Sequence, residues 1–326
     1  MLSINSFISK YFLLSLFSPL FVLGLVIFNI KNYIPWDQIQ KIWDPNVGPL
    51  PYLTHVHFTR LLVSSPGLYL DELYPSLGYS LFIIFFIFII SVIFVSLNKI
   101  LYDKPPPFIS LFLLTILFLF MNGRGIISWV AWLNIFRVNL LVQIVPEKVN
   151  KYKLLLVVLF SLLLASVSSG VFVTCSLFIV FSFFPFVVSK LNQFFASLRV
   201  RITRNSLLFV FLAFAFSIPV LSLFWRFLDK VISFYGGGFY SIIGLISHGL
   251  FGILPSIDFP IIVVTLFFFA VIVFVTINYL RLPYLVSLSI LLPVFGSAFG
   301  FTILTLSIPI FLIVLPSKFS GKSLPI

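Results

Sequence analysis

The stretch SLFIIFFIFIISVIFVSL, residues 80–97, carries no charged side chain. A helix needs about 20 apolar residues to cross the roughly 30 Å hydrocarbon core of a bilayer, so this run predicts a membrane-spanning helix. Similar apolar blocks follow it along the chain, and short basic loops separate them. The sequence therefore predicts an all-α, polytopic integral membrane protein.

The composition favours a lipid environment. Of the 326 residues, 61% are hydrophobic and 9% are charged, whereas an average soluble domain has about 25% charged residues. The net charge of +12 is explained by Lys and Arg collecting in the short cytoplasmic loops of membrane proteins, so we expect membrane lipids and no nucleic acid as partners. The single cysteine, Cys175, rules out an internal disulfide.

The apolar blocks predict about ten membrane helices in a single transmembrane domain, residues 1–326. The expected helices lie at roughly 11–30, 79–98, 107–122, 125–146, 153–167, 170–189, 206–227, 260–280, 283–299 and 301–316. Small residues suit a reversal of the chain near Ser168–Gly170 and at Gly296–Gly300. The first block is interpreted as a retained membrane helix, because it is longer than the apolar part of a signal peptide.

Charge counting predicts the orientation of the helices. With both termini in the cytoplasm, the inner loops hold 13 of the 20 basic residues, and six of the eight acidic residues lie outside. Two long outer loops result, 31–78 and 228–259. The apolar segment 240–256 is short, and we interpret it as interfacial or re-entrant; as an eleventh span it would reverse everything after it.

Arginines at the outer ends of helices are the first candidate functional residues, because a charge at membrane depth is costly and usually has a partner or a ligand. Arg124 stands between Gly123 and Gly125, and Arg226 ends a predicted helix. Either guanidinium could grip a phosphate through two parallel hydrogen bonds. The alternatives are a snorkelling Arg124 and a local ion pair between Arg226 and Asp229.

Five further residues complete the candidate set. Arg60 in the first outer loop and Arg137 are further candidates for binding the pyrophosphate. Arg137 lies about 20 Å deeper than Arg124 along a helix, and its alternative is a structural or cavity-lining role. His248 is the first candidate for a general base, or else an interfacial histidine with one backbone hydrogen bond. Asp71 and Glu72 either act as a base or cap the following helix.

The sequence predicts neither a metal nor a cofactor. His55 and His57 form an HxH pair, but a convincing third ligand is missing. The chain also lacks a GxxxxGK loop, a GxSxG elbow and a GxGxxG turn. We therefore expect an activity that does not depend on ATP or on a nucleotide cofactor.

The arrangement resembles the O-antigen and exopolysaccharide polymerases of the Wzy-type, EpsG-like group. The similar stretch runs from NGRGIISW (122–129) through Arg137 and PEKVNKYK (146–153) to LLLVVLFSLLLASVSSGVF (154–172), and LDELYPSLGYSL (70–81) is loosely similar to an early helix mouth in the group. Ser168 and Ser169 stand where the EpsG-like branch commonly has a histidine. The resemblance implies a helical bundle like those of GT-C-type enzymes.

The resemblance also implies an activity and a location. The enzyme would be a glycosyltransferase in the inner membrane of a bacterium, building a surface polysaccharide such as the O-antigen of lipopolysaccharide. It would move a growing glycan from undecaprenyl pyrophosphate to a lipid-linked repeat unit on the periplasmic face. Arg124 and Arg226 would stabilise the leaving pyrophosphate, and no metal would be needed. A chain-length regulator is a further possible partner.

Two other functions fit the same composition. A GT-C-type glycosyltransferase that uses a polyprenyl-phosphate sugar would have an acidic motif in its first outer loop, a role that Asp71 and Glu72 could fill. A flippase or transporter of lipid-linked oligosaccharide would have charges along a central path. Here the candidate charges gather at the outer face instead, and Arg137 is the exception.

Overall fold

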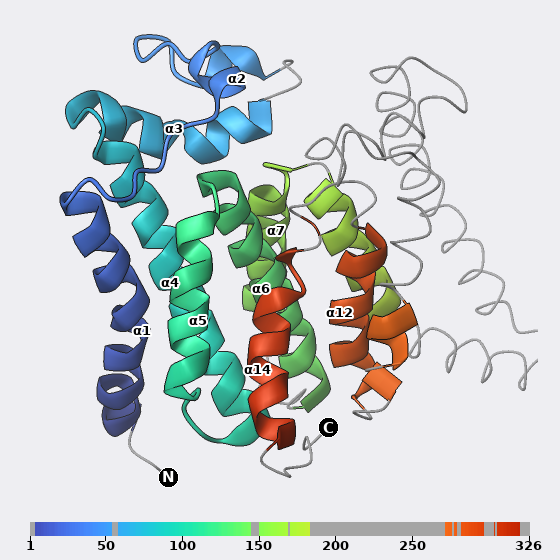
Figure 1. The fold of residues 1–326 in the computed structure, drawn as a ribbon. Coiled ribbons are helices and arrows are strands. Elements are labelled where there is room, and N and C mark those ends of the chain that lie inside the picture. The colour runs from blue at the N-terminus through green and yellow to red at the C-terminus, as the bar shows by residue number, and fades with distance from the viewer. Residues whose placement is uncertain are drawn as a thin grey trace, which may run out of the picture.

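The computed structural model describes residues 4–53, 58–144, 150–168, 170–182, 271–275, 277–278, 282–296, 303 and 305–319. Within these ranges the regular secondary structure consists of helices, with no strand, which confirms the expected all-α class (Figure 1). The expected helix 206–227, the loop 228–259 and segment 240–256 lie outside the described residues, as does most of 260–280.

Most of the described helices coincide with the predicted apolar blocks, and α2, η1 and α3 do not. The described helices include α1 (Ile4–Ile27), α2 (Asp37–Gln40), the 3-10 helix η1 (Leu50–Tyr52), α3 (Phe58–Leu73), α4 (Gly78–Tyr102), α5 (Phe108–Phe120), α6 (Gly123–Ile144), α7 (Lys151–Ala165), the helix Gly170–Ser182, α12 (Tyr284–Gly296) and α14 (Ile308–Phe319). Among the described helices, α4 and α6 are long and apolar enough to cross a membrane. The turn expected near Ser168 is present between α7 and the next helix.

Local sequence signals explain where these helices begin and end. Asp103 adopts a left-handed conformation with a φ of 50°, and its N–H closes the last turn of α4 on the Lys99 carbonyl. Prolines 105–107 then prevent the helix from continuing, and α5 begins directly after them. The side chains of Asn122 and Asn150 cap the starts of α6 and α7 by accepting backbone N–H groups.

Helix α6 is the centre of the bundle, and α4, α7 and α12 pack against it. Its Trp129 and Trp132 are fully buried, together with Phe118 of α5 and Phe178 of the helix Gly170–Ser182. The Trp129 Nε1–H donates to Thr305 Oγ1 at 3.1 Å, which links α6 to the C-terminal part of the chain. The described helices therefore share one apolar core.

Helix α3 lies crosswise over one end of the bundle (Figure 1) and packs against α4 and α7. The sequence predicts only a loop over 31–78, whereas the structure contains the helices α2, η1 and α3 in this segment. One face of α3 is buried, and its Leu61 and Leu68 form a small second core with Ile39 of α2. The segment that contains α2 and η1 therefore packs against α3.

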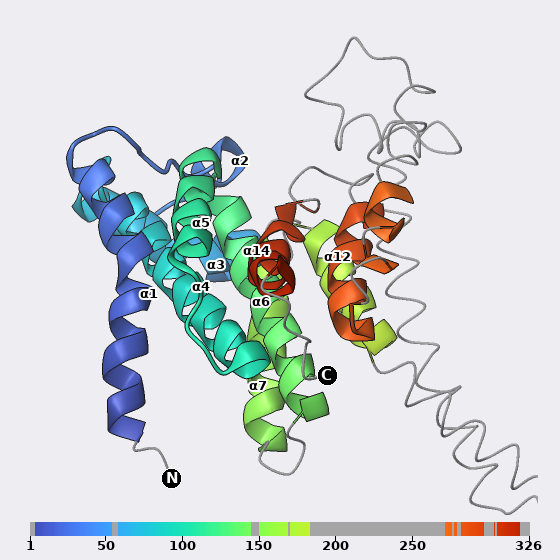
Figure 2. The ribbon, with the colours of Figure 1, turned by 60° about the horizontal axis from the view of Figure 1, so that its bottom comes forward.

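The two ends of the bundle differ in charge. Helices α1 and α7 begin, and α4, α6 and α14 end, on the side away from α3 (Figures 1 and 2). We call this side the basic end, and its charged residues within the described ranges are Lys10, Lys99, Asp103, Lys104, Lys151, Lys153 and Lys318. The α3 side carries both signs, namely Lys31, Asp37, Lys41, Asp44, Arg60, Asp71, Glu72 and Arg124.

Gly78→Ala tests the corner between α3 and α4. A Cβ at Gly78 would collide with the backbone carbonyl of Leu70, so we expect this variant to lose about 1–3 kcal/mol of stability through overpacking. Gly24→Ala in α1 is the matched control, because a Cβ there meets no atom within 4 Å. Thermal unfolding of the two detergent-solubilised variants measures the difference. Equal melting temperatures would contradict the close approach of α3 to α4.

Candidate functional site

The candidate site lies at the α3 side of the bundle, where α1 and α5 end and α4 and α6 begin. Lys31 follows α1, and its side chain reaches the far end of α5. Lys31 Nζ donates to the Met121 carbonyl at 3.4 Å and lies 4.9 Å from the centre of the Tyr33 ring. A cation is stabilised by the carbonyl end of a helix and by the face of an aromatic ring. Partial burial lowers the pKa of Lys31 from its usual value.

Tyr33 fixes the segment that carries Lys31. Its hydroxyl donates to the Phe118 carbonyl of α5 at 2.8 Å, and its N–H donates to Ser80 Oγ of α4 at 3.0 Å. Both hydrogen bonds are buried, so losing either partner would leave a buried polar group unsatisfied. The chain that leaves α1 is therefore held against α4 and α5 at a defined position.

Arg124 is the second residue of α6 and lies three residues beyond Met121. The two glycines beside it are closely packed: a Cβ at Gly123 would come within 2.8 Å of the Ile83 side chain, and one at Gly125 within 2.9 Å of the end of the Met121 side chain. Because Arg124 is at the start of α6, its guanidinium lies at the positive end of the helix dipole. This end favours a bound anion and disfavours a cation. We call Lys31, Tyr33, Met121 and Arg124 the Lys31–Arg124 corner.

This corner has the elements of an anion-binding site. It joins an ammonium, a half-buried guanidinium and the N-terminus of a long helix. An oxyanion bound between such groups gains charge-assisted hydrogen bonds, which are stronger than neutral ones. Phosphate oxygens fit this chemistry, and so do the oxygens of a carboxylate.

The two candidate acids, Asp71 and Glu72, make structural hydrogen bonds. Asp71 Oδ1 accepts from the N–H of Tyr79 in the first turn of α4 at 3.3 Å. Glu72 Oε1 accepts from Trp43 Nε1 and so ties the end of α3 to the segment that precedes it. Of the two roles that the sequence left open for Asp71, the structure contains the capping contact. A role as a base stays a prediction for both residues.

The other predicted site residues lie apart from the corner. Arg60 is in the first turn of α3, eleven residues before Asp71 and thus about 16 Å from it along the helix; its burial lowers its pKa. Arg137 is in the far half of α6, about 20 Å from Arg124. Arg226 and His248 lie outside the described residues. Of the predicted arginines, the structure places Arg124 beside this corner, where Lys31 contacts Met121 three residues before it, and it does not bring the full predicted set together.

Lys31 is the residue that sequence reasoning missed. Lys31 follows the first apolar block directly, so the sequence predicts that it lies at the end of the first helix. Its contact with Met121 joins residues 90 positions apart, and no local pattern predicts such a contact. His55 and His57 lie outside the described residues. Within the described part of the chain, His, Cys, Asp and Glu side chains form no group of three that could hold a metal ion.

Comparison of the chain with protein-family models, with curated proteins and with solved structures finds no match.

Asp71→Ala and Asp71→Asn separate a structural role of this carboxylate from a role as a base. As a helix cap, Asp71→Ala should lose about 1 kcal/mol of stability, whereas Asp71→Asn keeps an acceptor oxygen and should unfold near the wild-type temperature. Thermal unfolding in detergent measures both. An Asp71→Asn variant as unstable as Asp71→Ala would contradict the capping role.

Proposed function

We propose that this chain is an integral membrane glycosyltransferase that polymerises a surface polysaccharide of a bacterium. The first support is the surface of the bundle. Large apolar side chains are exposed along α1, α5 and α7, for example Leu20, Phe112 and Leu156. Exposed apolar area on this scale is unfavourable in water and favourable against lipid chains. With α4 and α6 long enough to span, this surface supports a membrane location.

The charge distribution supports an orientation. Six lysines and one aspartate of the described residues lie at the basic end, whereas the α3 side has equal numbers of basic and acidic residues. Lys and Arg are enriched on the cytoplasmic side of membrane proteins, so the basic end faces the cytoplasm. The Lys31–Arg124 corner then opens on the periplasmic side of the inner membrane.

The observation that carries the proposed activity is the Lys31–Arg124 corner itself. In the reaction, the acceptor hydroxyl oxygen of a lipid-linked repeat unit forms a bond to the anomeric carbon of the growing glycan. The bond from that carbon to the pyrophosphate oxygen breaks, and the electron pair leaves with undecaprenyl pyrophosphate. Fixed cations next to the leaving oxygens stabilise this developing charge, and each such contact typically contributes about 10²–10³-fold in rate.

The acceptor hydroxyl also loses a proton to a base in this step. His248 is the first candidate from the sequence, and Asp71 and Glu72 are the alternatives among the described residues. Direct displacement by the acceptor inverts the anomeric carbon. The phosphate ester of the donor is already activated, so the step consumes no ATP.

Polysaccharide ladders from the native host test this proposal. Deletion of the gene should leave surface glycan with a single repeat unit and no longer chains. Arg124→Ala and Lys31→Ala should each reproduce that loss while the protein is still made, because each removes one cation from the leaving pyrophosphate. Arg124→Lys should restore the ladder in part, since lysine keeps the charge but not the two parallel hydrogen bonds. Gel electrophoresis of extracted polysaccharide measures all of these.

Lys153→Ala is the matched control for these variants. Lys153 is an exposed cation at the basic end, in the first turn of α7, so its loss changes net charge equally without touching the corner. Its ladder should be normal. Normal ladders in both Arg124→Ala and Lys31→Ala would contradict the proposed activity of the corner.

A further inference from the structure

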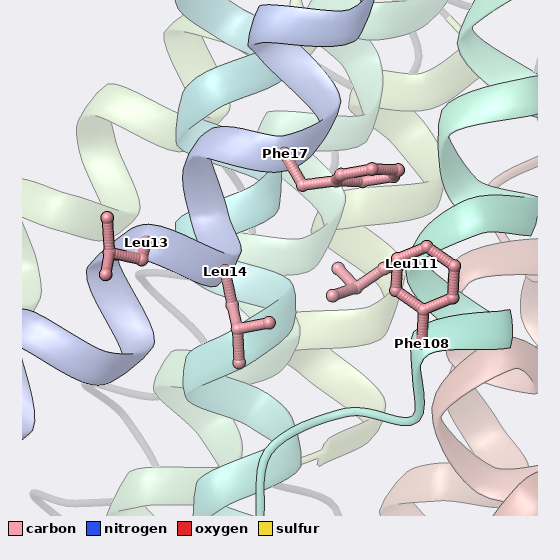
Figure 3. A pocket seen from close by; sticks show the side chains of 5 residues that line it. All are labelled: Leu13, Leu14, Phe17, Phe108 and Leu111. Atoms are coloured by element: carbon pink, nitrogen blue, oxygen red, sulfur yellow. The ribbon is translucent and has the colours of Figure 1, made fainter.

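An apolar groove lies between α1 and α5 on the lateral surface of the bundle. It has a volume of about 360 Å³ and is lined by Leu13, Leu14, Phe17, Phe108 and Leu111. In Figure 3, Leu14 and Phe17 of α1 point towards Phe108 and Leu111 at the start of α5. The Phe17 and Phe108 rings meet edge to face with their centres 5.2 Å apart. The lining side chains offer no hydrogen-bonding group, so the groove fits a hydrocarbon.

The size of the groove decides between two kinds of apolar occupant. A helix is about 10 Å across, so it would rest on this open groove of about 360 Å³ and would not enter it. A flexible hydrocarbon chain needs no such width and follows a seam between two helices. Both sides of the seam are also open, since Phe108 is 64% exposed and Leu13 is 69% exposed. The groove therefore suits an acyl chain better than a partner helix.

Positive charge stands beside the groove at the basic end. Lys99 Nζ lies 5.6 Å from the ring centre of Tyr11, which is one helical turn before Leu14 on α1. Lys104 is exposed on the short connection to α5, four residues before Phe108. Asp103 is the acidic residue of this connection and is exposed as well. The mouth of the groove therefore carries a net positive charge among its described residues.

We propose that this groove holds an acyl chain of an anionic phospholipid, whose phosphate pairs with Lys99 and Lys104. The distance from Tyr11 to Phe17 along the axis of α1 is about 9 Å, which is shorter than one membrane leaflet of about 15 Å. A headgroup at the level of the lysines thus places its chain against Phe17 and Phe108. Basic residues beside a membrane helix attract anionic lipids in the same way at the cytoplasmic surface. The inference depends on the membrane location and is independent of the polysaccharide reaction.

Native mass spectrometry of the purified full-length protein in detergent tests the lipid site. The probes are phosphatidylglycerol and phosphatidylcholine with identical acyl chains. We expect one phosphatidylglycerol to bind at least about tenfold more tightly than phosphatidylcholine. The double variant Lys99→Gln, Lys104→Gln should lower phosphatidylglycerol affinity to the level of phosphatidylcholine. Phe108→Ala should weaken binding of both lipids several-fold, because it removes one wall of the groove.

Two control variants separate the site from general lipid affinity. Lys153→Gln removes an exposed lysine from the same end of the bundle but from α7, and it should leave the preference for phosphatidylglycerol intact. Phe120→Ala removes an 83% exposed phenylalanine from the other end of α5, and it should leave both affinities intact. Equal affinities of the wild type for the two lipids would overturn the proposal. The proposal would also be overturned if the two control variants lost lipid binding as strongly as the groove variants. The melting temperature of each variant is measured to confirm that it is unchanged.

Discussion

The hydrogen bond from the Tyr33 hydroxyl to the Phe118 carbonyl decides how the functional end of this bundle is built. It holds the chain that leaves α1 against the end of α5, and the second bond from Tyr33 to Ser80 holds the same chain against α4. Lys31 is then positioned next to the turn that leads into α6. Because both bonds are buried, breaking one would leave a polar group without water or a partner. Other positions of this segment are therefore unfavourable.

Around this joint, the rest of the bundle follows from the separation of apolar surface and charge. Helix α6 is enclosed by its neighbours, whereas α1, α5 and α7 present apolar side chains outward. Apart from Arg137 within α6, the charged residues of the described part lie at the two ends, of which one is mainly basic and the other carries both signs equally. An apolar lateral surface between two charged ends accounts for both the groove between α1 and α5 and the Lys31–Arg124 corner at the opposite end. The groove is apolar with a basic mouth, and the corner carries two cations beside Tyr33 and Met121.

Among the described residues, the sequence predicts the long apolar helices well and the crossing helix α3 poorly, for a physical reason. An uncharged run such as 80–97 has few alternatives to a helix in lipid, and Asp103 with the prolines after it marks where that helix ends. The sequence predicts a loop where α3 lies, since α3 contains Pro66, mixes polar with apolar residues and packs against α4 and α7, which no local pattern shows. The sequence identifies Arg124 as a single charge at a helix start, but the hydrogen bond from Lys31 to Met121, three residues before it, joins segments far apart in the chain and no local pattern predicts it.

Labelling of introduced cysteines tests the orientation on which the proposed activity depends. The natural Cys175 is fully buried, so its replacement by serine gives a clean background for Asn32→Cys, beside Lys31, and Lys153→Cys, at the basic end. Spheroplasts exposed to a membrane-impermeant maleimide should label residue 32 and leave residue 153 unlabelled until the membrane is permeabilised. Labelling of residue 153 in intact spheroplasts, with residue 32 protected, would contradict a phosphate-binding corner that faces the periplasm.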